Sequence, residues 1–538
     1  MRTPDHSPNS AWRDPVFLAI MALAAFLIFK GLGDRPLWQD EAETANLARN
    51  VLATGLPTVT DGVNLVSQEE RREFDSDMIW RWSPWLQIYM SAAGQLVDPH
   101  GTFWARFLFA LTGLACIAAT YLLILARFGD RAWARLSAAL LACSVPFLLF
   151  ARQGRYYSAG GLILLAILWG FLGDWKRRWP PLAAIGLGMG LLFHANYLLL
   201  LSLAPPLLAA ALLLYRDRMS FPRTAMAVAM ASALVVPGIF LYRLGRQSTL
   251  FNIMLVPENI MLYFSDWVMF MVPLPVLAYL AWRWRGFFLG RGGPAEPAER
   301  FCLFSVLVMI GSFLILALFP QRFHRYIVHF YPLCAILLAW AGLALWRFSR
   351  PSGALFLVLV GLTNWLNLIP MERLKIVNRP WQNDLTMLTS VNVPLKLHLT
   401  ELFTGYPTDV NQSLIGFFNA NARPGQTILA EYSDMVLQYY TPFRVIGGLQ
   451  GPISPAEKPD WIAMRRDVRV NRDGFLFAPR EFILTRLDLA NDYERVELPM
   501  PDETFGNRAD PYFHYFVPAG PPQSPLVVYR RKEAPHAD

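Results

Sequence analysis

The amino-acid sequence predicts a polytopic α-helical membrane protein with a C-terminal extracytoplasmic α/β domain. Of its 538 residues, 54% are hydrophobic and only 16% are charged, and the mean hydropathy is +0.32. Soluble domains carry roughly 25% charged residues, so most of this chain must be solvated by lipid. Eleven apolar stretches precede Pro370, and a polar tail follows it. The net charge of +8 does not indicate nucleic-acid binding, because most arginines occupy short loops between apolar stretches.

Each apolar stretch can form a membrane span, since about 20 apolar residues cross a bilayer and shorter helices are tolerated inside a bundle. The predicted spans are Pro15–Leu32, Phe103–Leu125, Ala132–Phe150, Tyr157–Leu172, Pro181–Phe193, Tyr197–Leu214, Ala225–Tyr242, Met261–Ala281, Phe301–Phe319, Tyr326–Trp346 and Ala354–Ile369. The first is interpreted as a retained span, because Lys30, Gly31 and Gly33 form no small-x-small cleavage site. The division between the fifth and sixth is open, since one re-entrant hairpin or one long helix would change the count.

Basic residues in alternate short loops predict the topology. The loops after the second, fourth, sixth, eighth and tenth predicted spans form one set and contain fifteen lysines and arginines. The short loops after the third, seventh and ninth spans form the opposite set and contain six. Because cytoplasmic loops carry the excess of positive charge, we expect the first set to lie inside. Residues 1–14 are then cytoplasmic and residues 15–370 form the membrane domain. The long first loop, 33–102, and the tail, 371–538, then lie on the extracytoplasmic side.

The first outer loop has structure of its own. Asp40 to Thr54 is rich in alanine and leucine and is followed by Gly55, which predicts a helix and its stop. Trp80, Trp82, Trp85 and Tyr89 lie in an aromatic stretch up to Leu96. Such a stretch suits a juxtamembrane segment in the headgroup zone.

The tail predicts one small α/β domain built without disulfides. All four cysteines lie inside apolar stretches, so the tail has none. Short β-rich runs alternate with Pro, Gly and Asp, which is typical of strands and turns. The predicted strands are Thr427–Glu431, Trp461–Met464, Phe482–Thr485, Arg495–Leu498 and Leu526–Tyr529.

Ionisable and polar residues gather at the predicted outer ends of the spans, and ionisable groups at membrane depth tend to mark function. They are Asp40 and Glu41 after the first span, Arg152, Arg155 and Tyr156 between the third and fourth, His194 between the fifth and sixth, and His324, Arg325 and Tyr326 between the ninth and tenth. We therefore expect one polar cavity that opens outward.

A carboxylate beside arginines at a lipid surface suits group transfer from a lipid phosphate. Arginine binds phosphate oxygens through two donors at once, and a hydroxyl acceptor needs a general base, which Asp40 or Glu41 can supply. No soluble nucleotide sugar is available outside the cell membrane, so a lipid-linked sugar is the consistent donor.

Several motifs carry a family resemblance over about residues 10–370. They are Leu37-Trp38-Gln39-Asp40-Glu41-Ala42 with Ala45, Ala48 and Asn50 on the next turns, Gly55-Leu56-Pro57, Ser83-Pro84-Trp85-Leu86, Arg106, Ala151-Arg152-Gln153-Gly154-Arg155-Tyr156, and Arg325-Tyr326 ahead of Pro332. This pattern resembles membrane-embedded glycosyltransferases of the GT-C fold. The branch is that of the bacterial relatives of protein O-mannosyltransferases and the lipid A aminoarabinose transferase.

The resemblance implies inverting transfer of a sugar from polyprenyl phosphate to a hydroxyl of lipid A, another cell-surface glycan or a protein, at the outer face of the cytoplasmic membrane. It implies Asp40 as the base, with Glu41 supporting it or helping to hold a divalent cation. The donor phosphate falls to Arg155 and Arg325, assisted by Arg152 and Tyr326. Further pocket candidates are His194, His324, Tyr156, Asp75 and Asp77.

Two departures from the family pattern stand out. Relatives carry another acidic residue shortly after the loop that here contains Arg155, and none occurs before Asp174. Ser83-Pro84-Trp85 replaces the usual double proline. If a second carboxylate is needed, Asp75 or Asp77 is the candidate, and a cofactor beyond an optional divalent cation is not indicated.

Alternatives remain open for the residues and for the function. Asp40 can be the N-cap of its helix, with Glu43 completing a capping box. Arg155 and Arg325 can extend from span ends toward headgroups. A transporter or flippase would also place polar groups between spans, although it usually shows internal repeats, and transfer of another lipid-borne group is a third class.

Overall fold

The computed structural model describes residues 8–173, 179–247, 253–294, 296–320, 323–360, 365, 388–390, 403–405, 408–465, 477–502, 516–518 and 525–532. The chain divides into two compact units. The first contains Met1–Lys30, Phe109–Trp381 and Asn392–Phe403, and the second contains Gly31–Leu108, Gln382–Val391 and Thr404–Asp538. The first outer loop thus belongs with the C-terminal region. The predicted domain boundary at residue 370 lies outside the described residues.

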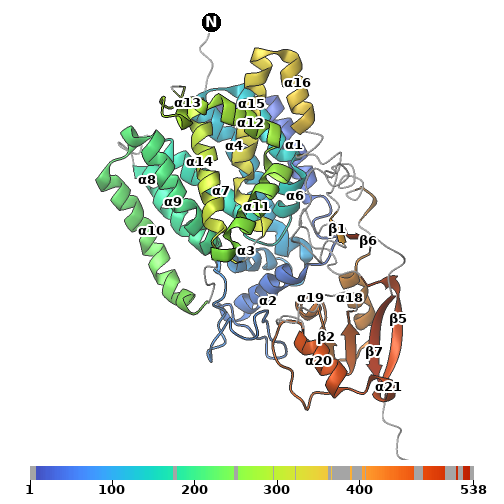
Figure 1. The fold of residues 1–538 in the computed structure, drawn as a ribbon. Coiled ribbons are helices and arrows are strands. Elements are labelled where there is room, and N and C mark those ends of the chain that lie inside the picture. The colour runs from blue at the N-terminus through green and yellow to red at the C-terminus, as the bar shows by residue number, and fades with distance from the viewer. Residues whose placement is uncertain are drawn as a thin grey trace, which may run out of the picture. The chain divides into compact units, whose positions relative to one another are not determined.

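The first unit is helical (Figure 1). Its longer helices are α1 (Pro15–Phe29), α4 (Thr102–Phe128, shared with the second unit), α5 (Arg131–Cys143), α6 (Val145–Ala151), α7 (Tyr157–Phe171), α8 (Trp179–Ala195), α9 (Tyr197–Leu214), α10 (Phe221–Leu241), α11 (Val256–Asp266), α12 (Leu274–Arg283), α14 (Pro297–Leu316), α15 (Tyr331–Phe348) and α16 (Arg350–Leu359). Short elements are η1 (Pro8–Arg13), η2 (Arg216–Arg218), η3 (Leu244–Arg246), η4 (Ile253–Leu255), the π-turn η5 (Trp267–Met271), α13 (Arg285–Phe288), η6 (His324–Tyr326) and η7 (Val328–Phe330).

Several of these helices can cross a membrane. Among the described residues, five are long and apolar enough, and α5 with α6 makes a sixth if that pair, bent by 67°, is one span. The bend falls at Ser144, whose side chain caps α6. The predicted span Met261–Ala281 is broken by η5 and Pro273, and part of Ala354–Ile369 lies outside the described residues. The count of eleven spans therefore stays a prediction.

The open division between the fifth and sixth predicted spans is two helices in the structure. Asn196 separates α8 from α9, and its side chain accepts the Leu198 backbone N–H at 2.9 Å, which caps α9. On α8, Gly186 lies so close to Ala227 of α10 that a Cβ would collide with the Ala227 carbonyl. Small residues of this kind allow close helix packing in membranes.

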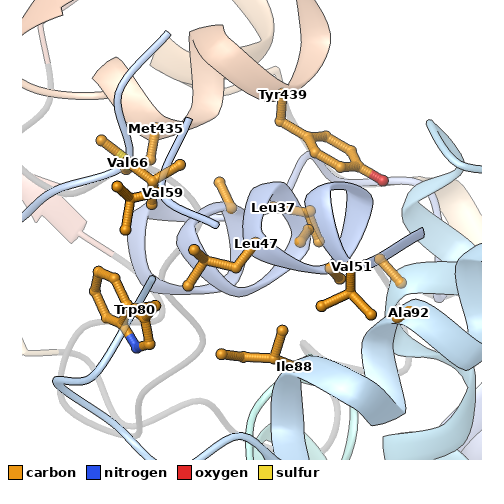
Figure 2. Packing of buried hydrophobic residues seen from close by; sticks show 14 of the residues in the cluster. Leu37, Leu47, Val51, Val59, Val66, Trp80, Ile88, Ala92, Met435 and Tyr439 are labelled. Atoms are coloured by element: carbon orange, nitrogen blue, oxygen red, sulfur yellow. The ribbon is translucent and has the colours of Figure 1, made fainter. Parts of the chain in front are cut away.

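The second unit begins with two helices of the first outer loop, α2 (Gln39–Thr54) and α3 (Leu86–Gln95). Helix α2 ends at Gly55, whose φ of +80° is the left-handed conformation favoured by glycine. Leu47 and Val51 of α2 share a buried cluster with Ile88 of α3 and with Met435 of the C-terminal region (Figure 2).

The C-terminal part of the second unit is a five-stranded mixed sheet in the order β3-β2-β4-β7-β5. Strands β3, β2 and β4 are parallel, and β7 is antiparallel to both β4 and β5. The strands are β2 (Thr427–Ala430), β3 (Arg444–Gly447), β4 (Trp461–Met464), β5 (Tyr493–Pro501) and β7 (Pro525–Arg531); β1 (Leu388–Ser390) pairs with β6 (Phe516–Pro518). The helices are α18 (Val410–Asn421), α19 (Asp434–Tyr440), α20 (Phe477–Arg486) and α21 (Leu489–Asp492).

The structure confirms the helix after Asp40 and four of the predicted strands, and it corrects two expectations. Phe482–Thr485 is part of helix α20, because Pro479, Phe482 and Ile483 are buried at helical spacing while Leu484 is exposed. Trp80 is not a headgroup anchor. It is fully buried in the cluster of Figure 2, and its indole N–H donates to Ser83 Oγ at 3.0 Å.

Candidate active site

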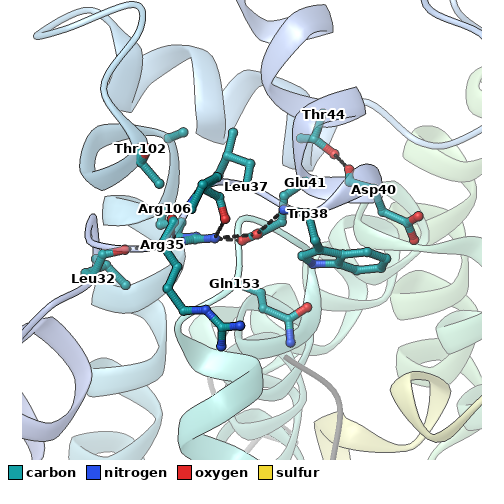
Figure 3. A network of polar contacts seen from close by, with 12 residues as sticks. Leu32, Arg35, Leu37, Trp38, Asp40, Glu41, Thr44, Thr102, Arg106 and Gln153 are labelled. Atoms are coloured by element: carbon teal, nitrogen blue, oxygen red, sulfur yellow. Dashed lines mark hydrogen bonds and ion pairs between the residues drawn. The ribbon is translucent and has the colours of Figure 1, made fainter. Parts of the chain in front are cut away.

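The first turn of α2 carries the acidic pair at its positive end. Trp38 is the N-cap residue, and its backbone N–H donates to Glu41 Oε2 at 3.2 Å. Asp40, the second helical residue, is therefore not the N-cap, and the capping box with Glu43 does not form. The half-buried Asp40 carboxylate points away from Glu41 (Figure 3). The helix dipole favours a carboxylate at this position.

Glu41 is held in a buried ion pair with Arg106, at the start of α4. Glu41 is 1% exposed, and its two carboxylate oxygens accept Arg106 Nε at 2.8 Å and Nη2 at 2.6 Å (Figure 3). Arg106 also donates to the carbonyls of Leu32, Arg35 and Pro36 at 2.9 to 3.0 Å. Because removing one member of a buried pair leaves an uncompensated charge, this network fixes the loop before α2. Glu41 thus helps to fix the start of α2, whereas the Asp40 carboxylate points away from this ion pair.

A turn at residues 67–73 brings further carboxyl groups to α2. Buried Glu73 accepts Ser67 Oγ at 2.8 Å and the Glu69 backbone N–H at 2.6 Å. Gln68 Nε2 donates to Glu43 Oε2 of α2 at 2.5 Å, which ties the turn to the helix. Glu70 lies at the sharp end of the turn with a φ of +58°, a strained value for a residue other than glycine.

Burial raises the pKa of Glu69, in the same turn, to about 7, with Glu73 adding repulsion. Asp40 contributes a small repulsion to this raised pKa, less than burial and Glu73 contribute. Asp77, by contrast, is paired with Arg81 at 2.5 Å, and that hydrogen bond lowers the pKa of Asp77. The Asp75 carbonyl accepts the Met78 N–H at 2.9 Å. Sequence reasoning missed Glu69, since it stands in an acidic run with no motif around it.

The arginines at residues 152 and 155 lie in the first unit, in the loop between α6 and α7. Arg152, 8% exposed, donates through Nη1 to the carbonyls of Leu27, Ile28 and Lys30 at 2.8 to 3.0 Å. These carbonyls lie at the C-terminal end of α1, where backbone acceptors lack helical partners. Arg152 therefore ties this loop to α1.

Arg155 and Arg325 both lie near the buried ring of Tyr156. Burial raises the pKa of Tyr156 well above its ordinary value, and the positive charges of Arg325 and Arg155 counter that rise. The half-buried guanidinium of Arg325 lies 4.2 Å from the centre of the Phe323 ring and 5.9 Å from that of Tyr326. Two arginines from separate segments thus share one aromatic environment, which can hold an anion between planar donors.

His324 and His194 are both engaged inside the first unit. His324 is buried, with Nδ1 3.3 Å from Asp266 Oδ2 and Nε2 2.9 Å from the Tyr331 hydroxyl. Asp266 ends α11 beside the π-turn, and sequence reasoning missed it because it lies inside an apolar stretch. His194 bridges α8 and α10, with Nδ1 2.9 Å from Tyr242 Oη and Nε2 3.1 Å from the Leu234 carbonyl.

The described part of the chain contains no group of three His, Cys, Asp or Glu side chains that could hold a metal ion. The carboxylates of the second unit and the arginines of the first belong to separate compact units. Their predicted convergence in one outward cavity therefore stays a prediction.

The arrangement of the helices defines a class of membrane protein. No protein-family model matches the sequence, and no curated protein does. Two solved structures of ArnT from Cupriavidus metallidurans do match. The apo form has a TM-score of 0.54 and 18% identity over 82% of this chain and 86% of ArnT.

The second ArnT structure, bound to undecaprenyl phosphate, has a TM-score of 0.53 and 16% identity over 81% of this chain and 86% of ArnT. An oligosaccharyltransferase from Archaeoglobus fulgidus matches with a TM-score of 0.45 and 13% identity, over 90% of this chain and 70% of that one. The likeness to the two ArnT structures gives the chain the GT-C fold, with several membrane-capable helices and a C-terminal sheet, and the predicted relationship is confirmed at the level of the fold.

Proposed function

We propose that this protein is a glycosyltransferase that moves a sugar from a polyprenyl-phosphate donor to a hydroxyl acceptor. The observation that carries the proposal is the fold shared with ArnT, which was solved with undecaprenyl phosphate, in a chain that presents Asp40 beside a rigidly held Glu41. The acceptor class is a hydroxyl of lipid A, of another cell-surface glycan or of a protein.

In the proposed reaction, the Asp40 carboxylate takes the proton of the acceptor hydroxyl. The acceptor oxygen then forms a bond to the anomeric carbon from the face opposite the phosphate. The bond between that carbon and the phosphate oxygen breaks, and its electron pair leaves with the phosphate, so the anomeric configuration inverts. Arg155 and Arg325 stabilise the departing polyprenyl phosphate through fixed positive charge.

The proposal includes a topology with α2 and the C-terminal sheet on the extracytoplasmic side. Asp34 is exposed six residues before Asp40. Of the native cysteines, Cys116, Cys302 and Cys334 are buried and Cys143 is half-buried, so the cysteine-containing wild type is the background for labelling. An Asp34→Cys variant should react with a membrane-impermeant maleimide added to spheroplasts. Labelling only after the membrane is opened would contradict this topology.

The direct test incubates the purified protein with undecaprenyl phosphate carrying different sugars and with each class of acceptor. We expect release of free undecaprenyl phosphate, measured by mass spectrometry, for one donor and only with its acceptor. A transporter or flippase would move the lipid across a vesicle membrane and release none. Lack of release from every donor, in protein that keeps its thermal unfolding transition, would contradict the proposal.

A further inference from the structure

Helix α2, which carries Asp40, packs on helix α19 of the C-terminal sheet region within the second unit. Asn46 Nδ2 donates to the Met435 carbonyl at 2.9 Å, and the Leu37 backbone N–H donates to the Tyr440 hydroxyl at 2.9 Å. Met435 and Tyr439 also enter the apolar cluster around α2 (Figure 2). The C-terminal region therefore forms the support of this helix.

One contact reaches the residue next to Asp40. Asp434, the first residue of α19, is fully buried, and its Oδ1 accepts Gln39 Nε2 at 2.6 Å. Its other oxygen, Oδ2, accepts Gln450 Nε2 at 3.0 Å. These two amides come from residues 395 and 16 positions away in the sequence. The carboxylate thus joins α2 to the loop after β3.

The backbone around Asp434 is shaped to admit this carboxylate. Ser433 has a φ of +76°, which costs energy in a residue with a side chain. Gly448 also has a positive φ, +53°, and a Cβ there would lie 2.1 Å from Asp434 Oδ1. Only glycine fits so close to the carboxylate. Two unusual backbone positions therefore converge on one buried acid.

Stability alone does not account for an acid at this position. Burial raises the pKa of Asp434 to about 6, and the amides of Gln450 and Gln39 only partly oppose that rise. A buried charge without a cationic partner is generally a cost to folding. Replacing the acid and its two amide partners by apolar side chains would avoid that penalty.

We propose that Asp434 is a positioning residue that acts through Gln39 to aim the Asp40 carboxylate, a role that rests on the proposed function. Asp40 lies between two residues that buried charges hold in place, Gln39 by Asp434 and Glu41 by Arg106. Its backbone is therefore fixed from both sides. An error of about 1 Å in a reacting group can cost about 100-fold in rate.

The test compares Asp434→Asn, Gln39→Glu and the double variant. Asp434→Asn places an amide opposite the amides of Gln39 and Gln450, so one of the two acceptor oxygens is lost, and we expect kcat to fall about 10-fold with the donor KM nearly unchanged. Gln39→Glu brings two carboxylates together, and we expect a fall of about 30-fold. The double variant restores a carboxylate–amide pair, and kcat should recover to within about 3-fold of the wild type.

The matched control is Glu457→Gln, which removes an exposed ion pair with Arg444 in the same region and should leave kcat unchanged. A double variant no more active than the worse single variant would overturn the proposal. So would a loss of thermal stability in Asp434→Asn with unchanged kcat.

A second measurement is independent of turnover. Hydrogen exchange followed by mass spectrometry should rise in the first turns of α2 in Asp434→Asn and not in Glu457→Gln. Unchanged exchange in Asp434→Asn would show that Asp434 does not hold the start of α2 in place. If the wild type releases no undecaprenyl phosphate, the proposed function fails, and the exchange result still decides whether Asp434 holds α2.

Discussion

Each compact unit contains a pair of like-charged residues close in sequence, and in both pairs one member is buried while the other is half-buried. In the second unit, Glu41 is buried against Arg106 while Asp40 is half-buried. In the first unit, Arg152 is buried against the end of α1 while Arg155 is half-buried near Tyr156. Glu41 and Arg152 thus hold backbone segments in place through buried hydrogen bonds. Asp40 and Arg155 are partly accessible to solvent. Residue type alone does not distinguish the two roles.

The largest expected effect separates Asp40 from Glu41. Asp40→Asn removes the proposed base and should lower kcat about 1000-fold, within the usual range for general base catalysis, with an unchanged unfolding temperature. Glu41→Gln leaves the buried Arg106 without its carboxylate and should destabilise the protein by about 3 kcal/mol. Turnover assays and thermal unfolding of both variants check this. The matched control is the exposed Asp34→Asn. If Asp40→Asn keeps its activity, Asp40 is not the general base.

The next effect separates Arg155 from Arg152. Arg155→Gln should weaken binding of undecaprenyl phosphate about 10- to 100-fold, since a charge-assisted hydrogen bond contributes about 1.5–3 kcal/mol. Arg152→Gln should chiefly lower stability, by about 1–2 kcal/mol, because the carbonyls at the end of α1 lose their donor. Calorimetric titration with undecaprenyl phosphate and a melting curve distinguish the two. Equal losses of affinity in both variants would contradict the division of roles.

The smallest effect concerns the pH dependence that Glu69 adds beside Asp40. Its folded-state pKa of about 7 lies above the ordinary 4.5, so this group stabilises the fold below pH 4.5 and loses that contribution as the pH rises through 7. Glu69→Gln should therefore melt higher than the wild type at pH 8, by about 1 kcal/mol in stability after solvent screening, with the difference shrinking toward pH 5.

Asp77→Asn is the control of opposite sign for this pH effect. The hydrogen bond with Arg81 lowers the pKa of Asp77, so its contribution is present above its ordinary pKa and is lost in acid. The Asp77→Asn variant should melt slightly below the wild type at pH 8. A Glu69→Gln variant whose melting follows that of the wild type at every pH would show that Glu69 ionises like an exposed carboxyl.

Local signals made much of the architecture predictable. The helix after Asp40 starts one residue earlier than predicted and ends where predicted, because Gly55 adopts the left-handed conformation that stops it. The run Phe482–Thr485 was predicted wrongly, because a short apolar run fits a strand or a buried helix equally well. The break of the third predicted span at Ser144 was missed, although Pro146, at the start of α6, is the residue that cannot continue the preceding helix.

The sequence by itself determined which segments are apolar, where α2 ends, and which acidic and basic residues lie beside the apolar stretches, because these depend on neighbours along the chain. Only the tertiary structure decided what each charged residue contacts. Gln39 and Asp434 are 395 residues apart, and Glu41 and Arg106 are 65 apart. These pairings depend on how distant segments pack and on the cost of burying an unpaired charge, and local sequence patterns carry no information about either.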